Sequence, residues 1–462
     1  MKTPFRFCLF LSICFFSSAL SAQNWSWATR TPEMSDYIDV AVGPHGEAIS
    51  IYEAYNNAWH LDVHDSSGAL IREKEFYYLE PYGNCAFGVG TDATGNIYVV
   101  SRQSFEEPLE RNEHALDPEG YDEEEDEERE TTWHLYIVIE KFSPELELLG
   151  SLRVLQLTHF ENYSIEVRDF VVDDAGNCWL GGFTDDNKFS YKEQVINPGP
   201  AGCHFVMKVG ANMKEPAWIN TFIGSGPAYV LSFHLAVNKK GICVMTGAYA
   251  KTMQVGKTIL TSQPIKSLLE SEMYITAFRA DGTIAWVKSL LVPSYDTDVV
   301  ALSGGDFVCA GAFSDATQLG SVKLPAGKKY GSFVMSIDAK SGKMGKVYVN
   351  DTSMIIGLEA GLNNDFYCLF DLSGSSHVHY VFHFDKKMKG ERFSYVTVHN
   401  PVTASNGGAY YLAGTWSWIS RLGDPPNAKY VKGDGPHDGA DYGQGDSGGL
   451  VGRLELKTKG AK

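Results

Sequence analysis

Apolar and polar residues alternate over short stretches along most of this chain, and these stretches recur as a unit. Each unit has an apolar strand, a turn with Asp, Asn or Gly, and a second strand that ends in small residues. After the second strand come a variable loop, a third alternating strand, another turn and a fourth strand that often carries tryptophan. Residues 170–222 are an example. Alternation with a period of two is typical of β-strands with one buried face, so each unit is predicted to be a four-stranded antiparallel meander.

Copies of the unit begin near residues 39, 88, 169, 234, 298, 357 and 398, which gives seven units. Six or eight units stay open as alternatives, because the sixth and seventh copies are degenerate. One four-stranded sheet cannot bury both of its faces, so the copies must stack on one another. Radial stacking leaves only short, protected edges, whereas a row of separate sheets would need linkers that are not evident between the units. We therefore predict an all-β chain with the β-propeller fold and seven four-stranded blades.

The two ends of the chain complete one another. The last unit stops after its third strand, “GGLVGRLEL”, and has no fourth strand with tryptophan. The segment “NWSWATRTP” near the N-terminus matches the fourth-strand segments “PAWINTF” and “IAWVKSL”. We predict that residues 25–30 form the outer strand of the last blade and close the ring, which removes an open sheet edge.

The turn and strand pattern “DxxGNxYvxG”, followed by “FVxKx” and a late tryptophan, resembles the bacterial secreted β-propeller repeat family. The resemblance covers essentially all of residues 23–462. It implies a propeller fold and a setting outside the cytoplasm. It implies no catalytic residues for this chain.

Residues 1–22 have the layout of a secretory signal peptide. Lys2 and Arg6 precede an apolar run over residues 7–16, and small residues lead to Ala22. The run is too short to span a bilayer, and no later stretch reaches the roughly 18 apolar residues that a membrane span needs. We expect cleavage after Ala22, a single propeller domain over residues 23–462, and a location in the periplasm, in the medium or on the surface of a bacterium. A lipoprotein box ending at Cys14 is a weak alternative.

The net charge of −18 is concentrated in residues 105–131, where 14 acidic and 2 basic residues give −12. Such a segment buries too little apolar surface to become ordered, so we predict a solvated, disordered insertion inside the second blade. Calcium capture is the alternative, but the glycine-punctuated spacing of a calcium loop is absent. The acidic surface also argues against nucleic acid as a partner.

Six cysteines remain after the signal peptide is removed. In a chain of this length they do not form a dense disulfide framework, and four of them fall inside apolar strands, which favours buried free thiols; disulfide pairing stays open. The six are Cys85, Cys178, Cys203, Cys243, Cys309 and Cys368.

Polar residues recur at the start of the first strand of several units, seven residues before the first turn. In a propeller this strand lines the central channel, and ligands tend to bind at the channel mouth. The positions are Asp39, Gly88, Asp169, His234, Asp298 and Gly357. The favoured interpretation is that the Asp and His side chains bond backbone amides and join blades. The alternative is a ligand or cation site formed by Asp39, Asp169, His234 and Asp298.

Two other motifs point to chemistry. Gly445-Asp446-Ser447-Gly448-Gly449 matches the nucleophile signature of chymotrypsin-like proteases, but the alignment of the repeats places Gly448 at the entrance of a strand and only 13 residues follow Gly449. We therefore reject a serine protease. His377, His379 and His383 alternate along one strand and could chelate zinc, although a solvated histidine face is favoured.

These patterns favour a secreted, non-enzymatic binding or interaction propeller for a protein or glycan partner at the cell envelope. We expect a monomer with no cofactor, and whether it binds a metal stays unknown. The alternative is a hydrolase or lyase that acts on polysaccharide at the channel mouth with carboxylates or His234 as acid and base.

Overall fold

The computed structural model consists of β-strands and connecting turns in all the residues that it describes. These are residues 25–31, 36–54, 58–76, 85–108, 131–157, 165–184, 189–191, 194–196, 202–225, 233–262, 271–293, 297–313, 318–319, 322–324, 331–351, 353–372, 378–397, 399–405, 409–417, 419–422, 429–432 and 447–455. The predicted signal peptide lies outside these ranges. Within them the structure contains no helical segment of the length and apolarity that a bilayer crossing requires.

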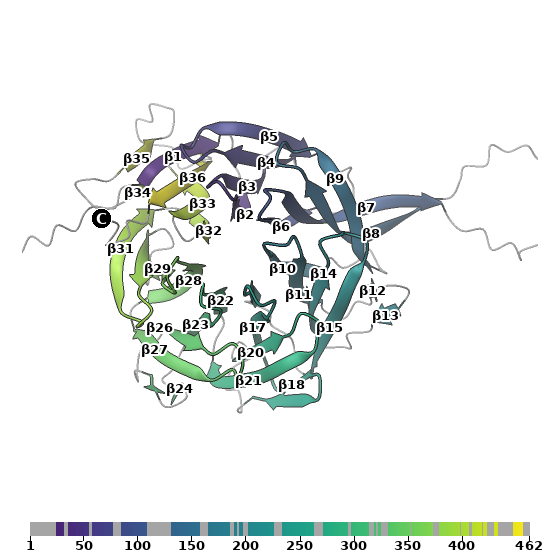
Figure 1. Ribbon diagram of the computed structural model, residues 1–462, viewed down its shortest axis with the longest axis vertical. Coiled ribbons are helices and arrows are strands. Elements are labelled where there is room, and N and C mark those ends of the chain that lie inside the picture. Colours follow the sequence, from purple (N-terminus) through teal and green to yellow (C-terminus); the bar gives the residue numbers. More distant parts are fainter. Residues whose placement is uncertain are drawn as a thin grey trace, which may run out of the picture.

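Seven four-stranded antiparallel blades surround a central channel, so the predicted fold is confirmed (Figure 1). Blade 1 comprises β2 (Asp36–Val42), β3 (Ala48–Glu53), β4 (Trp59–His64) and β5 (Leu70–Phe76), and blade 2 comprises β6 (Cys85–Thr91), β7 (Ile97–Pro108), β8 (Thr131–Phe142) and β9 (Leu148–Leu157). Blade 3 comprises β10 (Ile165–Val172), β11 (Cys178–Thr184), β14 (Cys203–Val209) and β15 (Pro216–Gly224), and blade 4 comprises β16 (Phe233–Val237), β17 (Cys243–Tyr249), β20 (Glu272–Phe278) and β21 (Ile284–Pro293).

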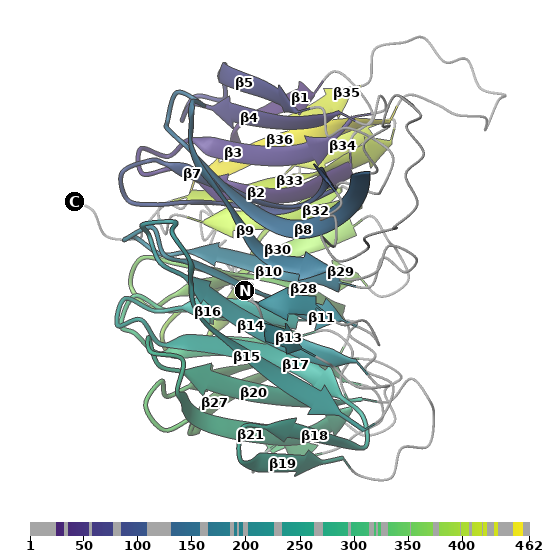
Figure 2. The same ribbon diagram turned by 90° about the vertical axis from the view of Figure 1, so that its right-hand side faces the viewer.

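The other three blades continue the same order from the channel outward. Blade 5 comprises β22 (Thr297–Ala301), β23 (Phe307–Phe313), β26 (Gly331–Ile337) and β27 (Met344–Asn350), and blade 6 comprises β28 (Ser353–Ala360), β29 (Phe366–Leu372), β30 (Val378–Phe384) and β31 (Gly390–Thr397). Blade 7 comprises β32 (His399–Ser405), β33 (Ala409–Ser417), β36 (Ser447–Glu455) and β1 (Trp25–Thr31). The inner strands run along the axis of the ring, whereas the outer strands β5, β21, β27 and β31 run more nearly around its rim (Figure 1 and Figure 2). We call the face that carries the turns between first and second strands the turn face.

The N-terminal strand closes the ring as predicted. β1 pairs with β36 in antiparallel register, from Trp25 opposite Leu454 to Thr31 opposite Gly449. Ser447 is the first residue of β36, and Gly448 follows it within the strand. The protease-like string therefore runs into the third strand of blade 7, as the alignment of the repeats predicted.

Tight turns between the first and second strands set the register of each blade. The glycines of these turns have positive φ between 72° and 93°, which residues with a side chain rarely adopt. They are Gly46, Gly95, Gly176, Gly241 and Gly305. Asn364 takes the same place in blade 6 with φ 59°, and Asn is one of the few other residues that tolerates this conformation.

Buried apolar side chains form clusters that neighbouring blades share. One cluster joins Val100 of blade 2 to Phe205 of blade 3, and another joins Phe307 of blade 5 to Met273 of blade 4. A fully buried side chain of this kind contributes about 1.5–3 kcal/mol. Stability therefore depends on the stacking of blades, as the repeat pattern predicted.

The cysteines are free thiols, so the alternative of disulfide pairing is wrong. Cys178, Cys203, Cys243, Cys309 and Cys368 are buried, and Cys85 is partly exposed. Burial raises the pKa of Cys85 to about 11 and that of Cys203 to about 12, so these thiols stay protonated and unreactive at neutral pH.

Short hairpins inserted between second and third strands reach back to the preceding blade. β12 (Phe189–Tyr191) and β13 (Gln194–Ile196) extend the sheet of blade 2, β18 (Thr252–Val255) and β19 (Thr258–Thr261) extend blade 3, and β34 (Ile419–Leu422) and β35 (Lys429–Lys432) extend blade 6. β24 (Gln318–Leu319) and β25 (Val322–Lys323) form a separate two-stranded sheet that contacts β21. These hairpins cover outer strand edges that would otherwise be open to other chains.

The acidic insertion lies between the second and third strands of blade 2, where it was predicted. Its predicted boundaries are too wide, because β7 continues to Pro108 and β8 begins at Thr131, with Pro108 opposite Thr131. Residues 109–130 lie outside the described residues. The paired ends of β7 and β8 extend away from the ring (Figure 1).

Candidate functional site

The polar positions predicted at the channel lie on the inner strands of their blades. Asp39, Asp169, His234 and Asp298 lie on β2, β10, β16 and β22, and each pairs with the second strand of its own blade. Gly88 and Gly357 hold the same place on β6 and β28. The spacing of seven residues from the turn therefore identified equivalent positions in six blades.

Each of the three aspartates joins its blade to the next one. One carboxylate oxygen accepts a hydrogen bond from the amide of the following residue, and the other accepts one from an amide in the next blade. Asp39 accepts these bonds from the amides of Val40 (2.8 Å) and Val89 (3.0 Å). Asp169 accepts them from Phe170 (2.7 Å) and Leu235 (2.6 Å). Asp298 accepts them from Val299 (2.6 Å) and Leu358 (2.6 Å). The favoured interpretation, that these side chains bond amides and join blades, is confirmed for the aspartates.

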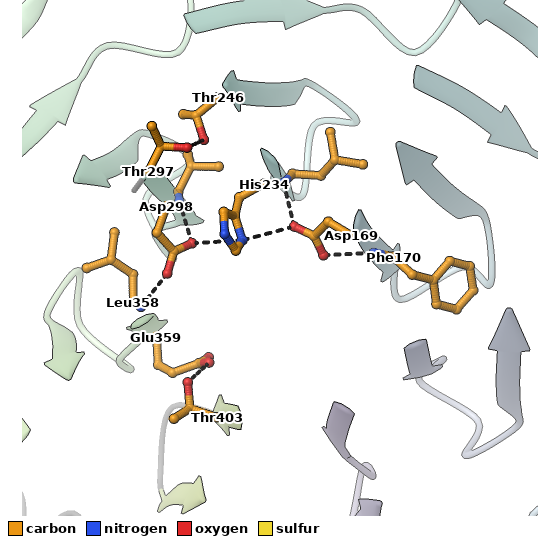
Figure 3. A network of polar contacts seen from close by, with 11 residues as sticks. Asp169, Phe170, His234, Thr246, Thr297, Asp298, Leu358, Glu359 and Thr403 are labelled. Atoms are coloured by element: carbon orange, nitrogen blue, oxygen red, sulfur yellow. Dashed lines mark hydrogen bonds and ion pairs between the residues drawn. The ribbon is translucent and has the colours of Figure 1, made fainter. Parts of the chain in front are cut away.

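His234 lies between two of these carboxylates (Figure 3). Its Nδ1 is 3.6 Å from Oδ2 of Asp169 and 3.6 Å from Oδ1 of Asp298. The His234 side chain is 39% exposed, against 22% for Asp169 and 14% for Asp298, so solvent and small solutes reach the imidazole more readily than the two carboxylates. A protonated imidazole at this position balances charge from blades 3 and 5.

A fourth carboxyl group, which the repeat spacing did not single out, belongs to Glu359 on β28. The Thr403 hydroxyl of blade 7 donates a hydrogen bond of 2.8 Å to its Oε1 (Figure 3). The sequence carried a signal for it. Two residues after the channel position, the other five units have Ala41, Gly90, Val171, Ala236 and Val300, so Glu359 is the one charged residue in an otherwise small or apolar column.

Burial raises the pKa of three of these carboxyl groups. Burial, together with the negative charges of Asp298, Asp39 and Asp169, raises the pKa of Glu359 to about 8, and the hydrogen bond from Thr403 opposes this rise. Burial also raises the pKa of Asp39 to about 7. Asp298 reaches only about 6, because the charge of His234 opposes the effect of burial. Glu359 is therefore largely a neutral carboxylic acid at pH 7.

The Tyr410 hydroxyl lies beside this group and is fully buried. Burial, and then the charge of Glu359, raise the pKa of Tyr410 well above its ordinary value. A side-chain hydrogen bond with Thr403 opposes the rise of its pKa.

A cavity of about 540 Å³ opens the channel on the turn face. Inner strands and turns of blades 3 to 7 line it, including Val171, Val237, Ala301, Ala360 and Ser405. Val171 follows Asp169 by two residues, and Ala360 follows Glu359 directly. The charged residues of the lining are Asp173, Asp174 and Lys239, and the carboxyl groups of Asp39, Asp169, Asp298 and Glu359 are not part of it.

The geometry does not favour a metal ion. Across the part of the chain that the structure describes, no group of three or more His, Cys, Asp or Glu side chains lies close enough to hold one. The aspartates of the channel are spread over blades 1, 3 and 5, and each already accepts two amide hydrogen bonds. A metal ion would need at least three ligands that converge on one point.

The histidine strand is not the solvated face that was expected. His379 is 3% exposed, with its Nδ1 3.6 Å from Oδ1 of Asp371. His383 is partly buried, stacks on Tyr367 and has its Nε2 3.0 Å from Oδ2 of Asp365. Each histidine therefore contacts its own carboxylate, and the two do not share a metal site within the described residues. His377 lies outside those residues.

The fold and the channel define a seven-bladed β-propeller closed by its N-terminal strand. No protein-family model matches this chain, and no curated protein matches its sequence. Similar solved structures include YCF48 bound to a D1 peptide, which aligns over 96% of this chain and 99% of its own at 8% identity and a TM-score of 0.45. The β-propeller domain of the Trilobed protease from Pyrococcus furiosus aligns over 87% and 100% at 9% identity and a TM-score of 0.46.

An acylaminoacyl peptidase in complex with a chloromethyl ketone aligns over 86% of this chain and 52% of its own, at 8% identity and a TM-score of 0.44. All three similarities lie below a TM-score of 0.5 and below 10% identity. What those proteins bind or cleave is therefore a property of those proteins.

Proposed function

We propose that this protein is a non-enzymatic binding propeller whose channel receives a polar group of a protein or glycan partner. The observation that carries the proposal is the open cavity of about 540 Å³ on the turn face, whose lining includes the charged Asp173, Asp174 and Lys239. Asp39, Asp169 and Asp298 lie on inner strands of the same channel. Ligand pockets of 300–1,000 Å³ with a few convergent polar groups are the usual small-ligand sites of such folds. The three aspartates are held by backbone amides, which suits a rigid recognition site.

The proposed setting is the envelope or exterior of a bacterium, and the proposed state is a monomer. The signal-peptide pattern of residues 1–22 and the resemblance to the bacterial secreted β-propeller repeat family support the first. The hairpins that cover outer strand edges support the second, because covered edges disfavour pairing between copies. Fractionation of the native host and light scattering of the purified protein test these two points.

The binding proposal is tested by narrowing the channel mouth. Ala175 is exposed on the cavity rim, and Ala175→Trp should place an indole over the opening. We expect purified Ala175→Trp to bind partners from a glycan array or an envelope pull-down at least 10-fold more weakly than the unaltered protein. Each captured partner is then measured again in purified form.

The matched control is Glu145→Trp, an exposed turn position of blade 2 that does not line the cavity. It should bind as the unaltered protein does. Equal affinities of Ala175→Trp and Glu145→Trp for every purified partner would exclude the channel as the binding site, as would the absence of any retained glycan or protein.

A hydrolase or lyase acting on polysaccharide is the second candidate. Neutral Glu359 beside aspartates that accept amide hydrogen bonds is the observation that favours it, since acid and base catalysis needs carboxyl groups in different protonation states. Release of reducing ends or unsaturated sugars from a polysaccharide panel, abolished by Glu359→Gln, would establish this activity. Binding without product release supports the binding propeller.

A further inference from the structure

The turns between third and fourth strands carry opposite charges on different sides of the turn face. In blades 5 and 6, residues 338–346 and 385–389 contain six exposed lysines and two acidic residues. The corresponding turns of blades 1 and 2, residues 65–69 and 143–147, contain Asp65, Glu145 and Glu147 and no lysine. The six lysines form a positive surface on a chain whose net charge is −18. We call them the lysine patch: Lys340, Lys343, Lys346, Lys386, Lys387 and Lys389.

The lysine patch is continuous across the two blades, and its charges are not neutralised from within. Nζ of Lys346 on β27 donates a hydrogen bond of 3.3 Å to the carbonyl of Lys387 in the turn of blade 6. The carboxylates of Asp338 and Asp385 accept hydrogen bonds of 2.8 Å from the amides of Ser341 and Lys387, so their own turns hold them. Among the residues that the structure describes, no lysine of the patch forms an ion pair with an acidic side chain. An anion from outside would therefore have no internal partner to displace.

An open strand edge lies beside the lysine patch. β27 is the outermost strand of blade 5 (Figure 1), and within the described residues it pairs only with β26. Hairpins extend the sheets of blades 2, 3 and 6, but none extends the sheet of blade 5 in the ranges that the structure covers. The unpaired amides and carbonyls of such an edge can pair with another strand. Lys346 belongs to β27, so the open edge and the lysine patch meet at this residue.

The two features together fit an extended acidic peptide. Such a peptide can add to a strand edge through its backbone while its side chains provide specificity. A polysaccharide lacks the regular amides and carbonyls that pair with β27, and a flat anionic membrane on the turn face would also meet the acidic turns of blades 1 and 2. β5 also ends its sheet, but Glu73 and Glu75 on that strand would repel acidic side chains.

We propose that the outer edge of β27 and the lysine patch together bind an extended acidic segment of a partner protein. The segment adds a strand to blade 5, and its carboxylates contact the lysines on the turn face. No lysine of the patch lines the cavity of the channel. The inference therefore goes beyond the proposed channel function and does not depend on it.

The test is fluorescence anisotropy with the labelled peptide Glu-Glu-Glu-Glu-Val-Thr-Val-Thr. We expect it to bind, and to bind at least 10-fold more weakly when salt rises from about 50 mM to about 500 mM, because salt screens exposed charges. Glu-Glu-Glu-Glu-Val-Pro-Pro-Val keeps the charges but lacks two amide hydrogens, and should bind at least five-fold more weakly. Tetragalacturonate has four carboxylates and no peptide backbone, and should compete at least 10-fold less well than the unlabelled first peptide.

Lys343→Glu combined with Lys387→Glu reverses two charges of the patch and should weaken binding of the first peptide at least 10-fold. The matched control combines Lys251→Glu with Lys257→Glu, the same change of charge at exposed positions of the β18–β19 hairpin, and should bind within two-fold of the unaltered protein. No binding by the unaltered protein, equal loss in both double variants, or equal binding of the proline peptide would overturn the inference. Equal competition by tetragalacturonate would overturn it too, in favour of a glycan.

A second copy of this chain could also supply an acidic segment, residues 105–131. Light scattering separates this occupant from a partner protein. Self-association that disappears when residues 109–130 are replaced by Asn-Gly would show that a second copy occupies the edge, and the inference of a separate partner would fail. A monomer that binds the first peptide supports it.

Discussion

At the scale of single residues, the buried acids of the channel and the aspartates of the turns affect stability in opposite directions. Hydrogen bonds from nearby hydroxyl and amide groups lower the pKa of Asp281, Asp338 and Asp385 in exposed turns. These turns lose stability only when pH falls below about 4. Burial raises the pKa of Glu359 and Asp39, so their contribution is greatest at low pH and is lost as pH rises toward 8.

Glu359→Gln should show the effect of a buried channel acid on stability apart from that of the turn aspartates. The pKa of Glu359 in the folded protein is about 8, above its unfolded value of 4.5, so folding binds a proton between these values and stability falls as pH rises through them. Glutamine keeps an acceptor for Thr403 and carries no charge. We expect the variant to be more stable than the unaltered protein by about 4 kcal/mol at pH 8 and by less than about 1 kcal/mol near pH 5.

Denaturant unfolding at pH 5, 6, 7 and 8 measures this difference, with Glu145→Gln as the exposed control. The groups that face Glu359 from other strands are Asp298, Asp39, Asp169 and Tyr410, with His234 beyond Asp298. A difference between Glu359→Gln and the unaltered protein that is independent of pH would show that its carboxyl group does not titrate in this range.

At the scale of strands and hairpins, inserted segments between second and third strands differ in what they bury. The β18–β19 hairpin packs Met253, Val255 and Leu260 against the core with at most 7% exposure. In blade 2 the pairing of β7 with β8 continues without interruption from Ile97 opposite Phe142 to Pro108 opposite Thr131. The β18–β19 hairpin is therefore part of the core. By contrast, the pairing of β7 with β8 in blade 2 is complete before the acidic insertion begins.

Replacing residues 109–130 by Asn-Gly should leave the ring intact. Asn-Gly suits a two-residue hairpin turn, and the strands that it would join are already paired at Pro108 and Thr131. We expect the melting temperature to change by no more than about 2 °C, since loop length has only a logarithmic effect on folding free energy. Differential scanning calorimetry measures this change.

The matched comparison replaces residues 252–261 by a similar short turn. That change removes three buried side chains and should lower stability by at least about 3 kcal/mol. If both replacements destabilise the protein equally, the acidic insertion has a structural role that the pairing of β7 with β8 does not reveal.

At the scale of the whole molecule, pairing between the first and last strands closes the ring. β1 pairs only with β36 in its sheet, and Ser26 donates a hydrogen bond of 3.1 Å to the Arg453 carbonyl. Without β1, β36 would become the outer edge of blade 7, with unpaired amides and carbonyls open to other chains.

A chain that begins at residue 32 should therefore be less stable than one that begins at residue 23. We expect its melting temperature to fall by about 10 °C or more, and we expect it to self-associate at higher concentration through the exposed edge of β36. Calorimetry and light scattering measure the two effects. Identical melting and a monomer at all concentrations would show that β1 does not contribute to closure.

The amino-acid sequence by itself determined the four-stranded blades and predicted the closure of the ring, because alternation with a period of two and turn residues such as Gly176 act locally. It favoured seven blades and left six or eight open, and the structure decided for seven. It also identified Asp39, Asp169, His234 and Asp298 as equivalent positions, because the repeat keeps a constant spacing to the turn. It did not show that Glu359, Thr403 and Tyr410 lie together on blades 6 and 7. Only the tertiary structure decided that, because the distances between polar groups on different blades depend on how seven sheets pack around one axis.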